Sequence, residues 1–201
     1  MNYHNKLLDI IAGLEKREKL LLHSCCGPCS TTVLSFLVKY FDITVLYYNP
    51  NIEPRDEYFH RKSEQIRFIK EFNDEHISFL DCDYDNATFR NKVKGLEQEK
   101  EGGARCAVCF RMRMEKAAIL AKDKGFTYFG TTLTVSPHKN SKVINEIGAL
   151  LESIYGVKYL YSDFKKKDGY KKSIELSKEY NLYRQDYCGC LFGRVVKNGS
   201  N

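Results

Sequence analysis

The sequence has no apolar run that approaches the roughly 20 residues needed to cross a bilayer, which excludes a transmembrane helix. It also has no signal peptide, since residues 1–6 carry neither an apolar core nor a small-residue cleavage site. Internal repeats and low-complexity segments are missing as well. We therefore expect a cytoplasmic globular protein with no membrane partner.

A strong bias of charge is also missing. The chain has 32 basic and 26 acidic residues, a net charge of +6, with 43% hydrophobic and 29% charged residues. This composition is typical of a globular protein that buries a sizeable core. The mild positive charge is compatible with a polyanionic partner such as nucleic acid, but many proteins carry it without binding one.

Cysteine, in contrast, is abundant. There are eight in 201 residues, although nothing in the sequence exports the chain and stable disulfides are rare in the cytosol. A lone cysteine such as Cys82 is most often a small buried apolar side chain. Clusters at short spacing in a cytosolic protein indicate metal or redox chemistry. The other seven form three such clusters: Cys25, Cys26 and Cys29; Cys106 and Cys109; Cys188 and Cys190.

The hydrophobic pattern alternates between strands and helices. Short β-branched and aromatic runs predict strands, and apolar residues at helical spacing predict helices between them. This order is typical of a parallel sheet covered by helices on both faces, so we expect one α/β Rossmann-like domain over residues 1–201. The expected strands are 19–24, 43–48, 76–80, 126–133 with its exit loop, and 158–161; the expected helices are 3–18, 28–40, a long one from Pro54, 87–93, 105–124, 141–155 and 170–180.

The stretch 19–29 combines the first expected strand with a turn that holds three cysteines. Pro28 suits the first turn of a helix, because its φ is fixed and its missing N–H needs no partner there. The turn then lies at the carboxyl edge of the sheet, where open α/β sheets bind ligands. The positive end of the helix also favours thiolates, the form that binds metal or attacks.

A second cysteine motif begins a later helix. Cys106 and Cys109 are three residues apart and share one helix face, so both sulfurs can bind the same metal. Together with Cys25 and Cys26 they make four thiolates, which suit an iron–sulfur cluster or zinc. Zinc sites usually combine two Cys-x-x-Cys motifs, whereas this set of four contains only one such motif, Cys106-x-x-Cys109, so the arrangement favours a cluster over zinc. Plain thiols and disulfides remain alternatives.

Two further cysteine pairs allow redox chemistry. Cys26-Gly27-Pro28-Cys29 matches the dithiol motif of thioredoxin-like proteins, but those usually have tryptophan where this chain has Cys25, and the sequence contains none. Cys188 and Cys190 are joined by one glycine, and such a pair forms a strained, easily reduced disulfide or bridges metals.

Three polar features accompany the cysteines. His23 precedes the first turn, and the sequence allows either a structural role in the core or a functional role at the site. The loop 136–139 (Ser-Pro-His-Lys) could place a proton donor and a cation near a substrate. The basic stretch 165–172 contains Tyr170 and suits phosphate contacts with base stacking, although such runs are usually solvated surface. Arginines at 105, 111 and 113 flank the second cysteine motif.

These motifs together resemble one family, the cobalamin-independent epoxyqueuosine reductases of the QueH type. The resemblance spans about residues 20–193. It is carried by five motifs in order: His-Ser-Cys-Cys-Gly-Pro-Cys at 23–29, Tyr-Tyr-Asn-Pro-Asn-Ile at 47–52, Arg-Cys-x-x-Cys-Phe-Arg at 105–111, Thr-Thr-Leu-x-x-Ser-Pro-His-Lys at 131–139, and Tyr-Cys-Gly-Cys at 187–190.

The resemblance implies a fold similar to the adenine nucleotide alpha-hydrolase-like proteins. It implies the last step of queuosine synthesis, reduction of the epoxide on the modified wobble base of tRNA, with an electron donor that the sequence does not identify. By position, it implies [4Fe-4S] cluster ligands at Cys25, Cys26, Cys106 and Cys109, and a catalytic redox-active pair at Cys188 and Cys190. The resemblance also implies that members can carry an additional mononuclear iron. Its ligands would draw on Cys25, on Cys29 as a further metal ligand, and on the pair Cys188 and Cys190, which is an alternative to the simple assignment of four cluster ligands and one redox pair. Some members have aspartate at the position of Cys29, so a thiol is not essential there.

Two rival functions remain. ATP-dependent tRNA thiolation enzymes share the fold type, but they need a glycine-rich phosphate loop after the first strand, where this chain has Ser24-Cys25-Cys26-Gly27. The second rival is a zinc-binding RNA module without catalysis, which metal content would distinguish.

Overall fold

The structure is a computed structural model that describes residues 2–193. Its centre is a five-stranded parallel sheet with the strand order β3-β2-β1-β4-β5. The expected α/β architecture with a parallel sheet is therefore confirmed. The strands are β1 (Glu18–His23), β2 (Phe41–Tyr47), β3 (Ile77–Asp81), β4 (Tyr128–Thr131) and β5 (Lys158–Tyr159).

The middle of the sheet forms because its strands are apolar on both faces. Leu20, Leu21 and Leu22 of β1 are fully buried, the pattern of a strand covered by helices on each side. Leu21 packs with Phe129 on one face, whereas Leu20 and Leu22 pack on the other. The register pairs His23 with Leu46 of β2 and with Thr131 of β4, so the three strands end level with one another.

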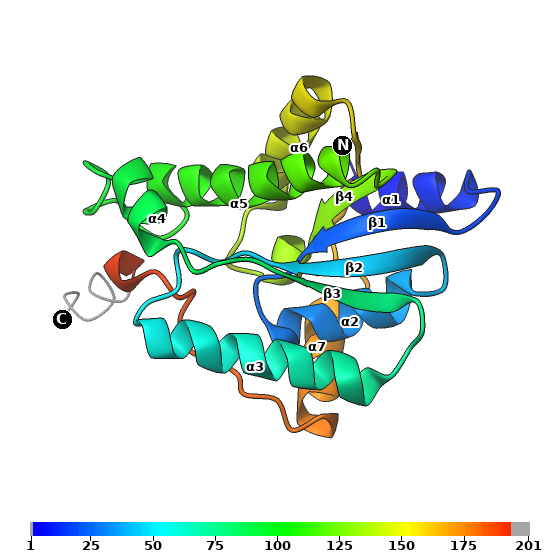
Figure 1. Cartoon of the computed structure of the whole chain (residues 1–201), viewed down its shortest axis with the longest axis horizontal. Helices are drawn as coiled ribbons and strands as arrows, with labels where there is room; N and C mark the ends of the chain where they lie inside the picture. The colour runs from blue at the N-terminus through cyan, green and yellow to red at the C-terminus, as the bar shows by residue number, and fades with distance from the viewer. Residues whose placement is uncertain (1, 194–201) are drawn as a thin grey trace.

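Helices cover both faces of the sheet, with α4, α5 and α6 on one side and α2, α3 and α7 on the other (Figure 1). No helix among residues 2–193 is long and apolar enough to span a membrane. The helices are α1 (Tyr3–Ala12), α2 (Gly27–Leu37), α3 (Arg55–Phe72), α4 (Asn86–Lys92), α5 (Ala104–Asp123), α6 (Ser141–Tyr155) and α7 (Gly169–Glu179), with a 3-10 turn, η1 (Thr132–Val135), after β4.

Several boundaries differ from the sequence expectation by a few residues: α2 ends at Leu37 rather than at 40, and β4 covers Tyr128–Thr131 rather than 126–133. Two further differences are larger or concern the edge of the sheet. The first helix was expected to reach residue 18, but α1 ends at Ala12, where Gly13 caps it through its N–H to the carbonyls of Asp9 and Ile10. Glycine is a poor helix former, and here its effect outweighs the apolar spacing that continues to Leu14. The fifth strand is two residues long rather than four: it is an edge strand that pairs only with β4, through Lys158 and Tyr159.

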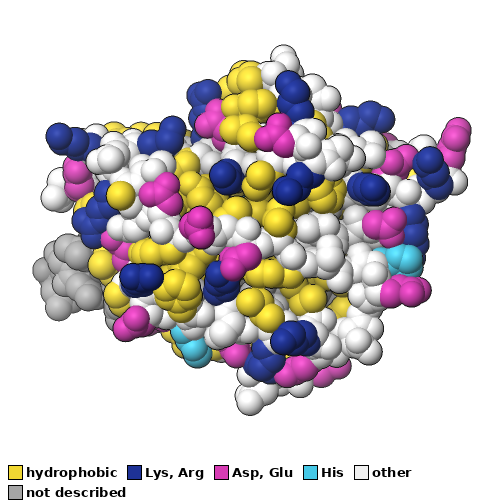
Figure 2. Space-filling view, in the orientation of Figure 1, with side chains coloured by type: hydrophobic (Ala, Val, Ile, Leu, Met, Phe, Trp, Pro, Cys, Tyr) yellow, Lys and Arg dark blue, Asp and Glu magenta, His cyan; other side chains and the backbone are white. Residues whose placement is uncertain are grey.

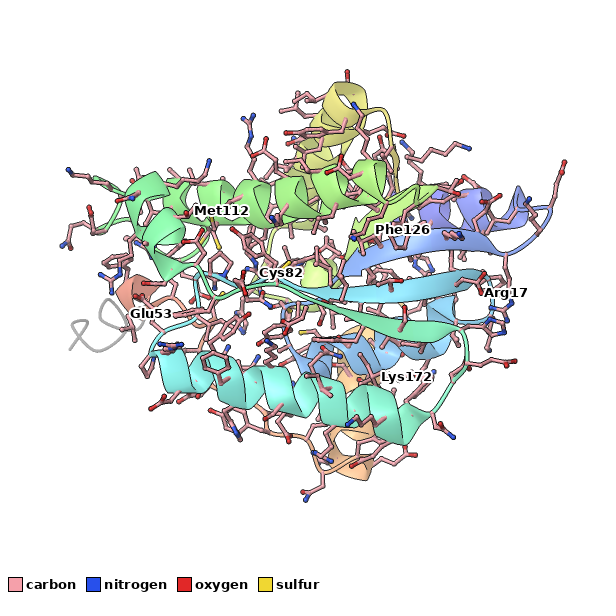
Figure 3. All side chains as sticks on the ribbon, viewed as in Figure 1. Arg17, Glu53, Cys82, Met112, Phe126 and Lys172 are labelled. Atoms are coloured by element: carbon pink, nitrogen blue, oxygen red, sulfur yellow. The ribbon has the colours of Figure 1, made fainter. Side chains whose placement is uncertain are left out.

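The strand order reverses direction between β1 and β4. In an open α/β sheet this switch point opens a crevice beyond the carboxyl ends of the strands, the usual place for a ligand. Glu53 lies near that edge, close to the C-terminal segment, whereas Arg17 lies at the opposite edge (Figure 3). The residues that follow β1 and β4, Ser24 and Thr132, are both buried at the switch point.

Candidate metal centre and substrate cleft

The first turn brings three cysteines together. Every pair of sulfur atoms of Cys25, Cys26 and Cys29, the first thiol group, lies within 4.8 Å. The Sγ atoms of Cys25 and Cys26 are 3.8 Å apart. Two thiolates on one tetrahedral ion, with metal–sulfur bonds of about 2.3 Å, lie about 3.8 Å apart. The group is therefore spaced for binding to metal.

The turn is fixed by buried polar contacts rather than by its own cysteines. Gln65 of α3 accepts hydrogen bonds through Oε1 from the hydroxyls of Ser24 at 2.6 Å and Ser30 at 2.8 Å. The side-chain amide of Asn49 donates to the carbonyl of Ser24 at 2.8 Å. From the β4 side, Thr132 Oγ1 accepts from the Cys25 N–H at 3.2 Å. Because three separate elements hold it, the turn is preorganised for a ligand.

Within the first thiol group one sulfur is favoured as the anion. Hydrogen bonds from Cys26 and Cys29 lower the pKa of Cys25 well below its usual value, and the charges of Lys139 and Arg113 act in the same direction. The same contact with Cys25 raises the pKa of Cys26 to about 11. Compared with Cys26, Cys25 is therefore the sulfur that loses its proton more readily, and thiolate is the form that binds iron or zinc.

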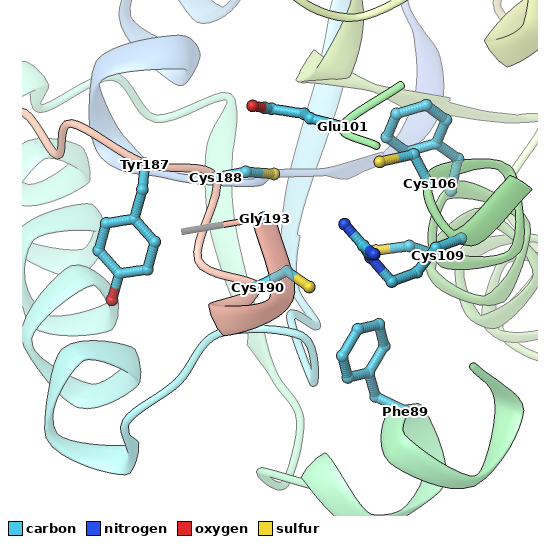
Figure 4. Close-up of a pocket in the computed structure, with 10 residues that line it drawn as sticks. Phe89, Glu101, Cys106, Cys109, Tyr187, Cys188, Cys190 and Gly193 are labelled. Atoms are coloured by element: carbon cyan, nitrogen blue, oxygen red, sulfur yellow. The ribbon is translucent and has the colours of Figure 1, made fainter. Parts of the chain in front are cut away.

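The second thiol group, Cys106, Cys109, Cys188 and Cys190, unites two distant parts of the chain. All four line one cavity, closed on its sides by Phe89 and Phe110. Figure 4 shows the sulfurs of Cys106 and Cys109 pointing from α5 toward those of Cys188 and Cys190. Burial raises the pKa of Cys109 to about 11 and raises the pKa values of Cys106 and Cys190 above their ordinary value.

The Cys188-Gly189-Cys190 segment is held in place by α3 and by the loop before it. Arg61 donates to the carbonyls of Tyr187 and Cys188, each at 3.4 Å, and stacks on the Tyr187 ring. Tyr187 donates its hydroxyl to the Glu53 carbonyl at 2.6 Å, and the Glu53 N–H donates to the Gly189 carbonyl at 2.9 Å. The position of the two thiols therefore depends on α3 packing.

Arg113 of α5 lies between the two thiol groups. It is 1% exposed, and its guanidinium contacts Cys109 Sγ at 3.6 Å and donates to Asn49 Oδ1 at 2.9 Å. Burial lowers the pKa of Arg113, but the negative charges of Cys109, Cys25 and Cys188 outweigh this effect and raise the pKa above its ordinary value. The two thiol groups therefore share one buried cation.

His23 has a structural environment. It is fully buried, with Nδ1 3.0 Å from the Thr131 hydroxyl and Nε2 3.2 Å from the Tyr48 carbonyl. Burial, together with the neighbouring charge of Arg113, lowers its pKa to about 3. His23 is therefore neutral at physiological pH and joins β1 to β4 beneath the first turn.

A cleft of about 350 Å³ opens above the first thiol group, within the size range of small-ligand sites. Cys25, Cys29 and Cys188 are among the residues that line it, so both thiol groups contribute to this cleft. The expected loop 136–139 contributes Ser136, His138 and Lys139. Glu101 and Arg113 also line the cleft, and the remaining lining residues come from α7 and the segment after it: Tyr170, Ser173, Arg184, Gln185, Asp186 and Tyr187.

The donor set fits an iron–sulfur cluster. The eight cysteines of the described region are all free thiols, so none is consumed by a disulfide. Cys25, Cys26 and Cys109 belong to one buried cluster, and Cys29, Cys106 and Cys190 pack against it. Soft thiolates in a water-poor pocket with a buried cation are the environment in which such clusters bind.

Two sequence features lie outside this centre. Cys82 follows β3 and packs, half-buried, against the core, beside Asp81, Asp83 and Lys116 (Figure 3). The basic stretch 165–172 reaches the cleft through Tyr170, while Lys166, Lys167, Lys171 and Lys172 are exposed. On the face over α3, β3 and α5, Figure 2 shows basic side chains interspersed with acidic ones. That face therefore has no continuous positively charged patch that would bind a polyanion.

Sequence reasoning missed the residues that position the thiols. Arg61 and Gln65 belong to none of the motifs, and Asn49 was noted only as part of the motif at 47–52, so the positioning role of all three is shown only by their buried contacts. A helical face that places Arg61 and Gln65 four residues apart among apolar neighbours was the available signal, but polar residues at that spacing usually face solvent.

Comparison of the sequence with known protein families and proteins identifies the family of this chain. The model of the family "Epoxyqueuosine reductase QueH" matches residues 20–195. The epoxyqueuosine reductase QueH of Staphylococcus epidermidis is 46% identical, over 99% of this chain and 87% of that protein. The same-named protein of Streptococcus pyogenes is 45% identical, over 98% and 80%, and that of Thermotoga maritima 36% identical, over 89% and 91%. The chain belongs to the QueH family of epoxyqueuosine reductases.

Proposed function

We propose that this protein is an oxidoreductase that reduces the epoxide of epoxyqueuosine in tRNA to the alkene of queuosine. One observation carries the proposal: the two thiol groups face the same cleft, at the switch point of the sheet, with Cys188 lining both pockets. Family membership supplies the substrate, and the site supplies soft ligands and a redox-competent thiol pair beside a space for a base.

The reaction needs two electrons and two protons. Both carbon–oxygen bonds of the epoxide break, a carbon–carbon double bond forms, and the oxygen leaves as water. An iron–sulfur cluster supplies electrons one at a time when it is bound. Oxidation of Cys188 and Cys190 to a disulfide releases two electrons and two protons, which balances the reaction. An external electron donor then restores the dithiol. His138 and Lys139 line the cleft as proton donors to the leaving oxygen.

For the cofactor we propose the ligand set Cys25, Cys26, Cys106 and Cys109 for a [4Fe-4S] cluster. The burial of Cys25, Cys26 and Cys109 in one apolar cluster supports it. Cys29 joins the metal ligands, because its sulfur is within 4.8 Å of the other two in the turn. An additional mononuclear iron would use this close spacing.

The same geometry favours a second ligand set. Cys188 and Cys190 face Cys106 and Cys109 across the cavity, so these four could instead hold the cluster and leave the first thiol group to a single iron (Figure 4). The two assignments differ in what Cys188 and Cys190 do, and the double serine variant discussed below separates them.

The tRNA is proposed to approach from the side of α7. Exposed lysines 166, 167, 171 and 172 lie next to Tyr170 at the rim of the cleft. Phosphate contacts at this rim would make binding fall steeply with salt, and Tyr170 is placed for stacking on a base. A tRNA substrate also agrees with the predicted cytoplasmic location.

The test is a direct assay of the reaction. Anaerobically purified protein is given tRNA that carries epoxyqueuosine and a chemical reductant, and the nucleosides are quantified by mass spectrometry. We expect queuosine from the native protein, none from Cys106→Ser, and near-native yield from Cys82→Ser as the matched control. Activity in a Cys106→Ser protein that lacks a cluster would contradict the proposal.

A further inference from the structure

Three arginines are almost completely buried, and their surroundings differ. Arg61 forms an ion pair with Glu57 at 2.6 Å. Arg105 donates to the carbonyls of Leu96, Glu97 and Glu99 at 3.0, 2.8 and 2.6 Å. Each has the carboxylate or the ring of carbonyls that a buried guanidinium normally requires. The third, Arg113, has neither.

The partners of Arg113 are neutral groups and a thiol. Its guanidinium donates to the Asn49 amide oxygen, approaches His23 Nε2 at 3.3 Å and contacts Cys109 Sγ. His23 is not an anion in any protonation state. None of the ion pairs found within residues 2–193 includes Arg113. A permanent buried charge without a counter-charge strongly destabilises a fold, so the missing anion needs an explanation.

Lys139, which lines the cleft, is a second cation that has no carboxylate partner among the ion pairs of the described residues. It is half-buried, lines the cleft with Cys25, Cys29 and Cys188, and is absent from the ion pairs of the described region. Although burial lowers its pKa, the charges of Cys188, Cys25 and Cys29 raise it above the ordinary value. Two carboxylates, Glu101 and Asp186, line the same cleft, but the charges that act on Lys139 are those of the thiols Cys188, Cys25 and Cys29, and two of these thiols also act on Arg113.

We infer that Arg113 and Lys139 are the counter-cations of the metal centre and set its reduction potential. This inference rests on the cluster assigned under the proposed function. A [4Fe-4S] cluster in its oxidised resting state, with four thiolates, carries a charge of about −2, which one arginine and one lysine neutralise. Adding an electron makes the centre more negative, so two nearby cations favour the reduced form and raise the potential.

The effect is specific to charge at the centre. Arg113 lies in the interior, where water screens little, whereas Arg111 lies two residues away on the exposed side of α5. Arg111→Met removes the same formal charge from the same helix and is the matched control for Arg113→Met. For Lys139→Met the control is Lys142→Met, whose side chain is 73% exposed.

The experiment is a redox titration of the cluster-loaded proteins, followed by the spectrum of the cluster, with iron and sulfide quantified for each. We expect the midpoint potential to fall by more than about 59 mV in both Arg113→Met and Lys139→Met, a tenfold change for a one-electron couple. Arg111→Met and Lys142→Met keep the native potential, and Arg113→Lys, which retains the charge, lies closer to the native protein than Arg113→Met.

The outcomes separate this inference from the proposed function. Native potentials in Arg113→Met and Lys139→Met proteins with full iron and sulfide would overturn the inference alone. A native protein without iron and sulfide would overturn the proposed function. If Arg113→Met does not fold, Lys139→Met decides, because the Lys139 side chain is only half-buried and lines the open cleft.

Discussion

The two thiol groups reach the same cleft in opposite ways. The first thiol group comes from five consecutive residues of one turn, and Cys25 and Cys26 are buried. The second joins α5 to a segment about 80 residues further along the chain, and three of its four cysteines are half-buried. One group is therefore formed by local structure, whereas the other is formed by docking of the C-terminal segment.

This difference indicates different tasks. A turn fixed by Ser24, Asn49, Gln65 and Thr132 holds its sulfurs at constant spacing, which suits a resident metal. A segment held mainly by contacts to backbone carbonyls changes position at lower cost. Such freedom suits a pair that passes between dithiol and disulfide, since the two states need different sulfur positions.

The largest expected effect comes from removing the redox pair. In the double variant Cys188→Ser, Cys190→Ser we expect epoxide reduction to fall roughly 100-fold or more, because residues that act as a unit fail together. Iron and sulfide, measured on the same preparation, stay at the native level. Loss of the cluster along with the activity would show instead that these two cysteines are ligands, which is the second ligand set described above.

A smaller effect is expected when the docking of the C-terminal segment is loosened. Arg61→Ala removes the ion-pair partner of Glu57, which among the described residues keeps only the hydrogen bond from the Tyr183 hydroxyl, and it removes the donor to two carbonyls; breaking a buried ion pair costs about 3–5 kcal/mol. Chemical denaturation measures this loss, with exposed Arg55→Ala as the control. Alkylation of Cys188 and Cys190 becomes faster in Arg61→Ala. An unchanged alkylation rate would mean that Arg61 does not position the pair.

The smallest effect concerns the glycine between the two cysteines. Gly189 has φ +111°, and a Cβ there would lie 2.8 Å from Cγ1 of Ile52. We expect Gly189→Ala to lower the free energy of unfolding by about 2–3 kcal/mol through backbone strain and crowding. Gly95 has φ +87° but open space around it, so Gly95→Ala costs about 1 kcal/mol. Equal losses in the two variants would exclude the contact with Ile52.

The sequence predicted the sheet and its helices well because each signal was local. The apolar run of β1, the Pro28 helix start and the spacing of α6 residues define their elements without help from the rest of the chain. Two of the boundaries that differed, at Gly13 and after Tyr159, depend on capping and on what lies beside the strand.

Part of the site was also predictable from the sequence, because its cysteine motifs are local signals. The cysteine motifs are visible in the sequence, and their gathering at one sheet edge follows from the parallel topology. The buried arginines were not predictable, because arginine is almost always exposed unless a partner far along the chain covers it. Arg113 was noticed only as a residue beside a cysteine motif, and its unbalanced charge appears only once the fold is known.

The measurement that tests the account most directly is the metal content of anaerobically purified protein, with iron, sulfide and zinc quantified and an absorption spectrum recorded. We expect about four irons per chain with matching sulfide, and a broad absorption band at about 400 nm. Any iron in excess of sulfide identifies the additional mononuclear site. Zinc alone, or no metal after careful reconstitution, would contradict the account and would favour a zinc-binding RNA module or a dithiol protein.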